Sequence, residues 1–197
     1  IGQVAHDYRG FGALKRDFGK SGSCNNDVIC PEGDPWRSQI DSEGNYTLSG
    51  SWACSGQMIN SNVAGNPPPY FLTAYHCGIT TSNAGSLVVY WNFQSPVCGQ
   101  HGGGSLTQHQ SGSTFKSKWS TSDFCLVQLN ADPQDAWHVY YTGWNADESN
   151  APANATAIHH PNNDEKSISF NYDPLTITSY LSNNVPGNGS HWRMEAA

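Results

Sequence analysis

The sequence predicts an all-β fold of the sandwich or barrel type. Short runs of β-branched and aromatic residues alternate with turns rich in Gly, Pro, Asn and Asp, which is the pattern of many short strands. No stretch has the apolar periodicity of an amphipathic helix. Only 13% of the 197 residues are charged and 12% are aromatic, a composition typical of a folded, turn-rich domain and not of a disordered chain.

The strands are expected one after another, following an N-terminal arm. Residues 1–23 are Gly-rich and of mixed charge, so we interpret them as an arm with little structure of its own. The expected strands cover residues 49–59, 70–74, 86–93, 113–119, 123–129, 137–144, 155–161, 166–172, 175–181 and 190–194. The connections include NPPP, CGQHGGG, NADPQD and NNVPGNG, all rich in turn residues. The turn at residues 130–134 is the expected boundary between two β subdomains.

Charge and hydropathy exclude two classes of partner. The formal net charge is −7 and no basic stripe occurs. A nucleic-acid partner is therefore not expected, because binding to phosphates needs clustered Lys and Arg. No run of about eighteen apolar residues is present, so we predict no membrane-spanning helix.

The cysteines indicate an exported protein. Six cysteines occupy positions 24, 30, 54, 77, 98 and 125, and they form no CxxC pair, which disfavours a structural zinc site. Wide spacing and low charge favour disulfides, which persist outside the reducing cytosol. We therefore expect a secreted, extracellular protein.

A histidine and an aspartate next to hydrophobic strands are the candidate catalytic pair. His76 follows the strand expected at residues 70–74, and Asp123 opens the strand expected at residues 123–129. A carboxylate at the start of a hydrophobic run is costly unless it is paired. An aspartate that accepts the Nδ1 proton of a histidine leaves Nε2 as a base near neutral pH, and such a base can deprotonate a serine. Cys77 is placed to tether this turn to a neighbouring strand.

Two other interpretations stay open from the residues alone. Trp36, Trp52 and Trp119 could stack on sugar rings in a carbohydrate-binding domain, although such residues are more often core packing. A metal site would draw on His159, His160 and either Asp164 or Glu165. Adjacent side chains of a strand point to opposite faces, however, so neighbouring histidines are poor ligands for one ion.

The sequence resembles a known protease family. FLTAYHCG and TSDFCLVQL are similar to the His and Asp motifs of chymotrypsin-fold serine endopeptidases, and the closer similarity is to the secreted bacterial lysyl endopeptidases. Further similar segments run in family order: SGSCNNDVICPEGD, ACSGQMIN, VVYWNF, QSGST, YYTGW and AIHHPNNDEKSIS. Tyr75 departs from the first motif, where Ala or His is more usual.

The resemblance implies a fold, a catalytic pair and two disulfides. The implied fold is a trypsin-like double β-barrel, with a complete first barrel at residues 24–130 and part of the second at residues 131–197. His76 takes the role of general base and Asp123 that of its orienting carboxylate, for cleavage after Lys or another basic residue. The implied disulfides are Cys54–Cys77 and Cys30–Cys98.

The resemblance also bears on four single residues. In the family the first cysteine pairs with one far toward the C-terminus, a role that falls here to Cys24. Cys125 is interpreted either as a buried thiol or as the partner of Cys24. Tyr180 lies near the position of a family aromatic that stacks close to the catalytic histidine, or it is an ordinary strand aromatic. His160 is expected to line the substrate cleft.

The nucleophilic serine of the family is not found in this sequence. We expect the serine, the oxyanion hole and the specificity pocket on a C-terminal chain of the same precursor, packed against this one or linked through Cys24. A degraded fragment, or a serine-less homologue that acts as a binding module, is the alternative. Polypeptides are the expected substrates, and acyl transfer needs no cofactor. Residues 1–20 are interpreted as the end of a pro-segment.

Overall fold

The structure is a computed structural model of the 197-residue chain. It describes residue 22 and residues 25–145, 150–182 and 184–194. The predicted N-terminal arm, except for residue 22, and Cys24 lie outside the described residues. Within the described ranges, no helix combines the length and the apolar character needed to cross a membrane.

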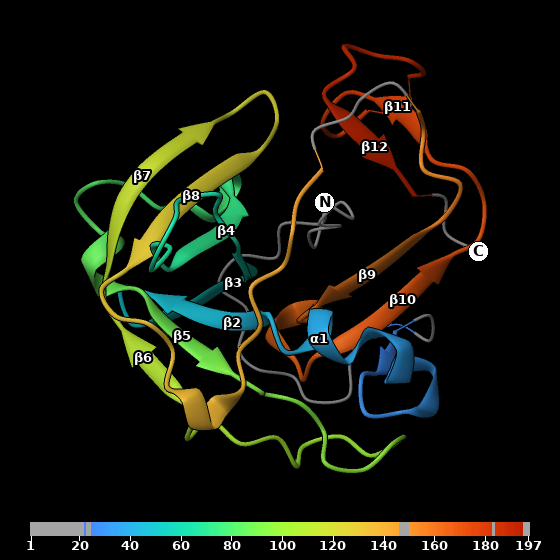
Figure 1. Ribbon diagram of the computed structural model, residues 1–197. Coiled ribbons are helices and arrows are strands. Elements are labelled where there is room, and N and C mark those ends of the chain that lie inside the picture. The colour runs from blue at the N-terminus through green and yellow to red at the C-terminus, as the bar shows by residue number, and fades with distance from the viewer. Residues whose placement is uncertain (1–21, 23–24, 146–149, 183, 195–197) are drawn as a thin grey trace.

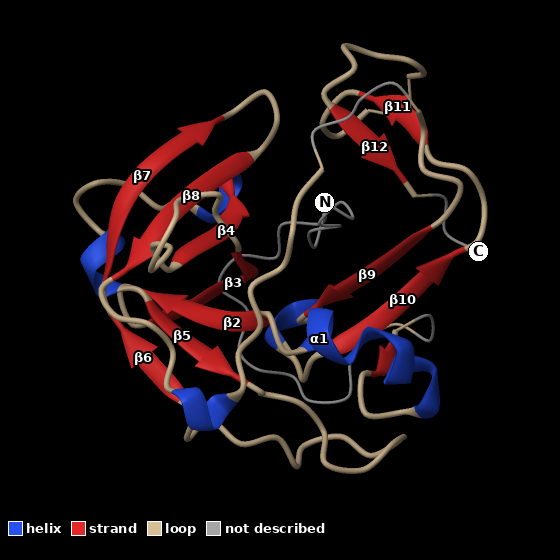
Figure 2. Ribbon diagram, viewed as in Figure 1, coloured by secondary structure: helices blue, strands red, loops and turns tan. Residues whose placement is uncertain are grey.

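Strands make up most of the regular structure, and the helical segments are short (Figure 2). The strands are β1 (Asn26–Asp27), β2 (Glu43–Leu48), β3 (Ser51–Ile59), β4 (Tyr70–Ala74), β5 (Val88–Trp91), β6 (His109–Ser111), β7 (Ser113–Trp119), β8 (Phe124–Leu129), β9 (Ala155–His159), β10 (Ser167–Asn171), β11 (Thr176–Thr178) and β12 (His191–Arg193). The helical segments are η1 (Pro31–Trp36), α1 (Arg37–Ile40), η2 (Tyr75–Cys77), η3 (Ala84–Ser86), η4 (Asp135–Trp137) and η5 (Pro161–Asn163). The predicted all-β class is confirmed.

Seven strands form one antiparallel sheet that curls back on itself (Figure 1). Their order is β6-β5-β2-β3-β4-β8-β7. The two edge strands, β6 and β7, are consecutive in the chain and meet at Gly112, whose φ of +91° suits the bend. The N–H of Gly112 donates to the carbonyl of Leu87 at 2.8 Å, and its carbonyl accepts the N–H of Asn130 at 3.1 Å. One bent segment therefore pairs with both β5 and β8, which gives the sheet the shape of a barrel.

Alternating side chains fill the inside of this curled sheet. On β8, Cys125, Val127 and Leu129 are buried while the residues between them are partly exposed. Successive side chains of a strand point to opposite faces, which explains this pattern. The main buried cluster consists of Tyr46, Met58, Phe71, Ile79, Ala84, Leu87, Val89, Trp91, Cys125, Val127 and Leu129.

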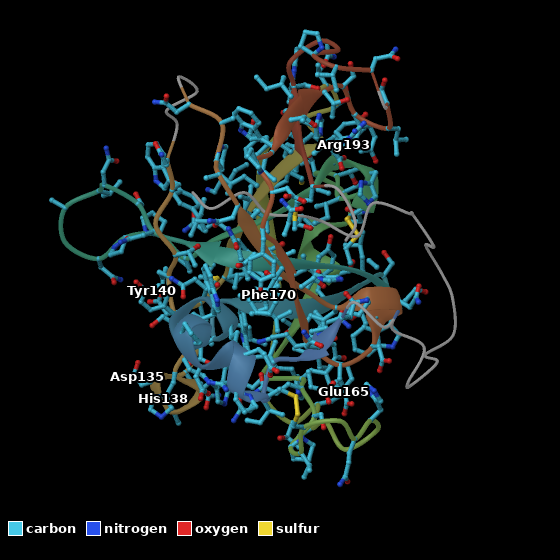
Figure 3. The ribbon with its side chains drawn as sticks, turned by 90° about the vertical axis from the view of Figure 1, so that its right-hand side faces the viewer. Asp135, His138, Tyr140, Glu165, Phe170 and Arg193 are labelled. Carbon is cyan, nitrogen blue, oxygen red and sulfur yellow. A yellow bond between two sulfur atoms is a disulfide. The ribbon has the colours of Figure 1, made fainter. Side chains whose placement is uncertain are left out.

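The C-terminal part of the described chain forms two smaller sheets. Strands β1, β10 and β9 make a three-stranded sheet, and β11 pairs with β12. Figure 3 shows Phe170 of β10 between Glu165, toward the lower end of the view, and Arg193 of β12, toward the upper end. The β11–β12 pair and the turn between β7 and β8 both lie at the upper end of the molecule in Figure 1.

Two buried carboxylates and a disulfide hold the loop after Cys98 against the three-stranded sheet. Glu165 accepts a hydrogen bond from the N–H of Gly102 at 2.9 Å, and Asp27 accepts one from the N–H of Gly99 at 2.8 Å. Both carboxylates are almost fully buried. The Cys30–Cys98 disulfide implied by the resemblance is formed next to them.

The strand predicted at residues 137–144 is wrong. The segment begins at the end of the short turn η4, and His138 follows with a φ of 55°. A non-glycine residue with positive φ cannot continue an extended strand. Only Thr142 makes a β-bridge, to Ile59. The segment after η4 instead runs upward between the curled sheet and the β9–β10 strands (Figure 1). The other predicted strands are found, most of them with shorter bounds.

Strand β2 was not predicted, although it lies in the middle of the large sheet between β5 and β3. Its first residues, Glu43, Gly44 and Asn45, are poor strand formers, and the strand is buried along most of its length. A Cβ on Gly44 would lie 2.6 Å from Cγ1 of Val89 and 2.9 Å from Cζ3 of Trp91. β2 is therefore a strand because it packs against the core, although the intrinsic strand propensity of its first residues is low.

Candidate active site

The turn after β4 and the turn before β8 carry the candidate catalytic pair. Strands β4 and β8 pair with Ala74 opposite Phe124. The residues just beyond this pair, on the two neighbouring turns, are therefore brought together. The N–H of Tyr75 donates to the carbonyl of Asp123 at 2.9 Å, which joins the two turns. The register of the sheet thus fixes where His76 and Asp123 meet.

Asp123 contacts His76 through both of its carboxylate oxygens. Oδ2 lies 2.6 Å from Nδ1 of the imidazole, and Oδ1 accepts the backbone N–H of His76 at 2.9 Å. The Asp123 side chain is only 9% exposed and that of His76 is 23% exposed. A carboxylate placed in this way favours the proton on Nδ1, so Nε2 is the nitrogen that can accept a proton. The arrangement can act as a general base whose orientation is set by a carboxylate.

The Cys54–Cys77 disulfide anchors the histidine turn to β3. This disulfide is the second one implied by the resemblance, and it is formed. The turn η2 contains His76 and Cys77 and ends at Gly78, whose φ is +80°. The turn is consequently held from two sides, by Asp123 next to β8 and by Cys54 on β3.

Two rings from the β11–β12 region pack beside the histidine. The ring of Tyr180 stacks on that of His76 with centroids 6.2 Å apart and planes 17° apart, and its hydroxyl lies 3.1 Å from Nδ1. His191 stacks on Tyr180 at 5.3 Å. Burial lowers the pKa of His191, and the charge of Asp123 opposes this shift. Tyr180, expected near the catalytic histidine, is thus placed in contact with it.

His191 belongs to this site and was not found by sequence reasoning. The pairing of Thr178 with His191 in β11–β12 brings it back to the ring of Tyr180. No motif around His191 marks this position, because the contact depends on how the connection between the two strands folds. The hydroxyl of Ser190 lies 2.7 Å from Nδ1 of His191.

His160, which was expected to line the substrate cleft, lies in the protein interior. It is 3% exposed, and its ring stacks on Phe93 with centroids 5.7 Å apart and planes 6° apart. Its Nδ1 is 2.9 Å from the carbonyl oxygen of Asp164. These contacts give His160 a packing role, and the structure does not bring it together with the catalytic pair.

The free thiol of Cys125 and the candidate metal ligands can also be placed. Cys125 is a buried free thiol on β8, in line with the first of its two interpretations, and burial raises its pKa to about 11. Among the residues that the structure describes, His159, His160, Asp164 and Glu165 do not form a cluster of metal ligands. Within the described ranges, the one such cluster consists of Cys54, His76 and Cys77.

The tryptophans considered for carbohydrate binding are mostly engaged in packing. Trp52 packs against Tyr90 with ring centroids 5.0 Å apart and also contacts Phe93. Trp36 packs against the buried cluster of the three-stranded sheet. Trp119 alone of the three is largely exposed, at 64%. A platform of several exposed rings is therefore not formed by these residues.

Comparison with known proteins identifies the family. The family model described as "Lysyl endopeptidase, C-terminal domain" matches residues 18–196. The chain belongs to the lysyl endopeptidase family. A lysyl endopeptidase of Pseudomonas aeruginosa is 29% identical over 168 residues, which cover 77% of this chain and 35% of that protein. The chain therefore spans about a third of the length of that relative.

Membership of this family also confirms the predicted fold class. The curled seven-stranded sheet, together with the smaller sheets at β9–β10 and β11–β12, is an all-β, trypsin-like fold in which the second barrel is partial. The candidate pair lies at the end of the curled sheet that faces β11–β12, and the rings of Tyr180 and His191 reach it from there.

Proposed function

We propose that this chain supplies the histidine and the aspartate of a secreted serine endopeptidase that cleaves polypeptides after Lys or another basic residue. The observation that carries the proposal is the double contact of Asp123 with the ring and the backbone of His76. Membership of the lysyl endopeptidase family supports the reaction class and the preference for lysine. The two disulfides support an extracellular location.

His76 is the general base in this proposal. With the Nδ1–H group donating a hydrogen bond to Asp123, Nε2 takes the proton from a serine hydroxyl while the serine oxygen attacks the scissile carbonyl carbon. The carboxylate 2.6 Å away stabilises the imidazolium that forms. The imidazolium then gives its proton to the leaving amine, and water hydrolyses the acyl-enzyme by the same route in reverse. Acyl transfer of this kind needs no cofactor.

The nucleophilic serine, the oxyanion hole and the specificity pocket are supplied in this proposal by sequence C-terminal to residue 197. That sequence belongs either to the same chain or to a second chain of the same precursor, which Cys24 could link. The match covers 35% of the Pseudomonas relative, so that protein carries sequence beyond the matched part.

Tyr180 acts as a positioning residue in this scheme. Its ring stacks beside the imidazole, and its hydroxyl lies close to the hydrogen bond between His76 and Asp123. A ring in this place keeps water away from that hydrogen bond, and hydrogen bonds are stronger where the local dielectric is low. His191, packed on Tyr180, supports the ring.

Peptides that differ only in the residue before the scissile bond test this function. With the full-length protein we expect kcat/KM for the Lys peptide to exceed that for a matched Leu peptide by about 100-fold or more, because a site built to pair with a charged group rejects an analogue that lacks it. His76→Ala serves as the control and must remove hydrolysis of every peptide. Equal rates would reject the lysine preference, and no hydrolysis by the wild type would favour the binding-module alternative.

A further inference from the structure

The disulfide beside the candidate base forms part of a group of potential metal ligands. The sulfur atoms of Cys54 and Cys77 and a ring nitrogen of His76 all lie within 4.8 Å of one another. The sulfurs are joined to each other, and all three side chains are partly exposed. Two thiolates and an imidazole are a ligand set that zinc prefers. The catalytic base therefore borders a site whose chemistry depends on the oxidation state of one disulfide.

We propose that reduction of the Cys54–Cys77 disulfide creates a Zn²⁺ site that takes His76 as its third ligand and withdraws it from catalysis. The reductant is a thiol: two R–SH molecules become R–S–S–R, and their two electrons and two protons convert the disulfide to two cysteine thiols. Zn²⁺ then displaces both thiol protons and forms two Zn–S bonds and one Zn–N bond. Water occupies the fourth position of the tetrahedron.

The three ligand atoms lie close enough together to be gathered around one ion after reduction. Zn–S bonds of about 2.3 Å and Zn–N bonds of about 2.0–2.1 Å place neighbouring ligand atoms roughly 3.5–4 Å apart. The two sulfurs can reach that separation by side-chain rotation once the bond between them is broken. Cys77 adjoins His76 in the turn η2, and Cys54 lies on β3, so both sides of the site are held by ordered elements.

Asp123 provides the support that a zinc-bound histidine usually has. Histidine ligands commonly donate their second ring N–H to a carboxylate, which fixes the ring and raises its basicity. Oδ2 of Asp123 already lies 2.6 Å from Nδ1 of His76. Nε2 is thus the nitrogen that can bind the metal without breaking this contact. The same carboxylate that orients His76 as a base would orient it as a ligand.

The inhibitory consequence rests on the proposed protease function, whereas the metal binding does not. If Nε2 is bound to zinc, it cannot accept the proton of a serine. Reduction in the presence of zinc should then switch off hydrolysis, and a chelator followed by reoxidation should restore it. The Cys30–Cys98 disulfide offers a matched control, because within the described residues it forms no comparable cluster with a histidine.

Cobalt binding to the full-length protein tests the site directly. The protein is reduced with a thiol, freed of it without oxygen, and titrated with Co²⁺ and then with Zn²⁺. We expect one Co²⁺ with sulfur-to-cobalt charge-transfer absorption and tetrahedral ligand-field bands, only after reduction. Cys54→Ser/Cys77→Ser should lose this spectrum and Cys30→Ser/Cys98→Ser should keep it. Asp123→Asn should weaken the affinity by about 10- to 100-fold, and His76→Ala by at least as much.

Several outcomes would overturn the proposal. The proposal is wrong if the reduced protein binds no Co²⁺ through sulfur. It is also wrong if His76→Ala binds Co²⁺ as tightly as the wild type does. If reduction alone loosens the fold, Zn²⁺ must restore the near-ultraviolet circular dichroism of the reduced wild type. It must not restore that of Cys54→Ser/Cys77→Ser. A wild type that does not recover with Zn²⁺ would also overturn the proposal. Peptide hydrolysis is scored separately: an oxidised protein that never cleaves peptides rejects the proposed function and leaves the spectroscopic result standing.

Discussion

Asp123→Asn is expected to lower kcat of the full-length protein by about 10⁴-fold on a Lys peptide. The amide cannot accept hydrogen bonds at both of its heavy atoms, so it cannot bind the ring and the backbone N–H of His76 as the carboxylate does. The imidazole then loses the Nδ1-protonated form that makes Nε2 a base, and the imidazolium loses its counter-charge. The volume of the side chain hardly changes, so the fold is expected to persist.

The control for this variant is a carboxylate that lies in solvent. Asp34 pairs with Arg37 at the surface and its side chain is 71% exposed, so Asp34→Asn should leave kcat within about twofold of the wild type, as surface pairs contribute little. Near-ultraviolet circular dichroism of both variants checks the fold. An Asp123→Asn protein that is correctly folded and retains a tenth or more of the wild-type kcat would contradict the role of Asp123.

Lys166→Met is expected to lower the free energy of unfolding by about 3 kcal/mol or more, because it removes the positive charge that partly offsets the burial of the Glu43 carboxyl group. Lys166 is fully buried, and its Nζ donates to the carbonyl of Ile40 at 2.7 Å. Its backbone N–H donates to the carbonyl of Phe93 at 2.9 Å. Burial lowers its pKa to about 8, while the nearby charge of Glu43 acts in the opposite direction.

The stability of Lys166→Met should fall as the pH rises. Burial raises the pKa of Glu43 from 4.5 to about 8 even with Lys166 present. Without the lysine, folded Glu43 keeps a proton that the unfolded chain releases above about pH 4.5, so the stability of the variant falls as the pH rises from 5 toward 8. Urea unfolding at pH 5 and pH 8 measures this. Glu43→Gln/Lys166→Met is the control and should remove the dependence; a variant as stable as the wild type at pH 8 would argue against a balanced buried pair.

The candidate catalytic pair could be predicted because its signals are local to strand ends. His76 follows an apolar run and Asp123 precedes one, and in an antiparallel sheet such ends meet when the two strands are neighbours. Strands β4 and β8 were found for the same reason, since each is a short, mostly apolar run next to turn residues. Family resemblance added the two disulfides, which no spacing argument could have paired.

Other parts of the structure depend on packing that the sequence does not display. β2 begins with Glu43, Gly44 and Asn45, which are buried. Their burial is explained by the side chains of Val89 and Trp91, which pack closely on Gly44. Lys166 looks like a surface residue in an ordinary polar run, yet it is buried with Glu43 as its electrostatic partner. His191 reaches the active-site rings only through the pairing of β11 with β12. Such contacts join segments far apart in the chain, so no local sequence pattern predicts them.

Labelling with a fluorophosphonate, which reacts with a serine activated by a general base, tests the central claim most directly. The full-length wild type should be modified at a single serine C-terminal to residue 197, identified by mass spectrometry of its peptides. His76→Ala, folded as judged by circular dichroism, should not be labelled on the same time scale, because the serine then has no base. Equal labelling of His76→Ala, or no labelled serine in the wild type, would contradict the assignment of His76 as the base of a serine endopeptidase.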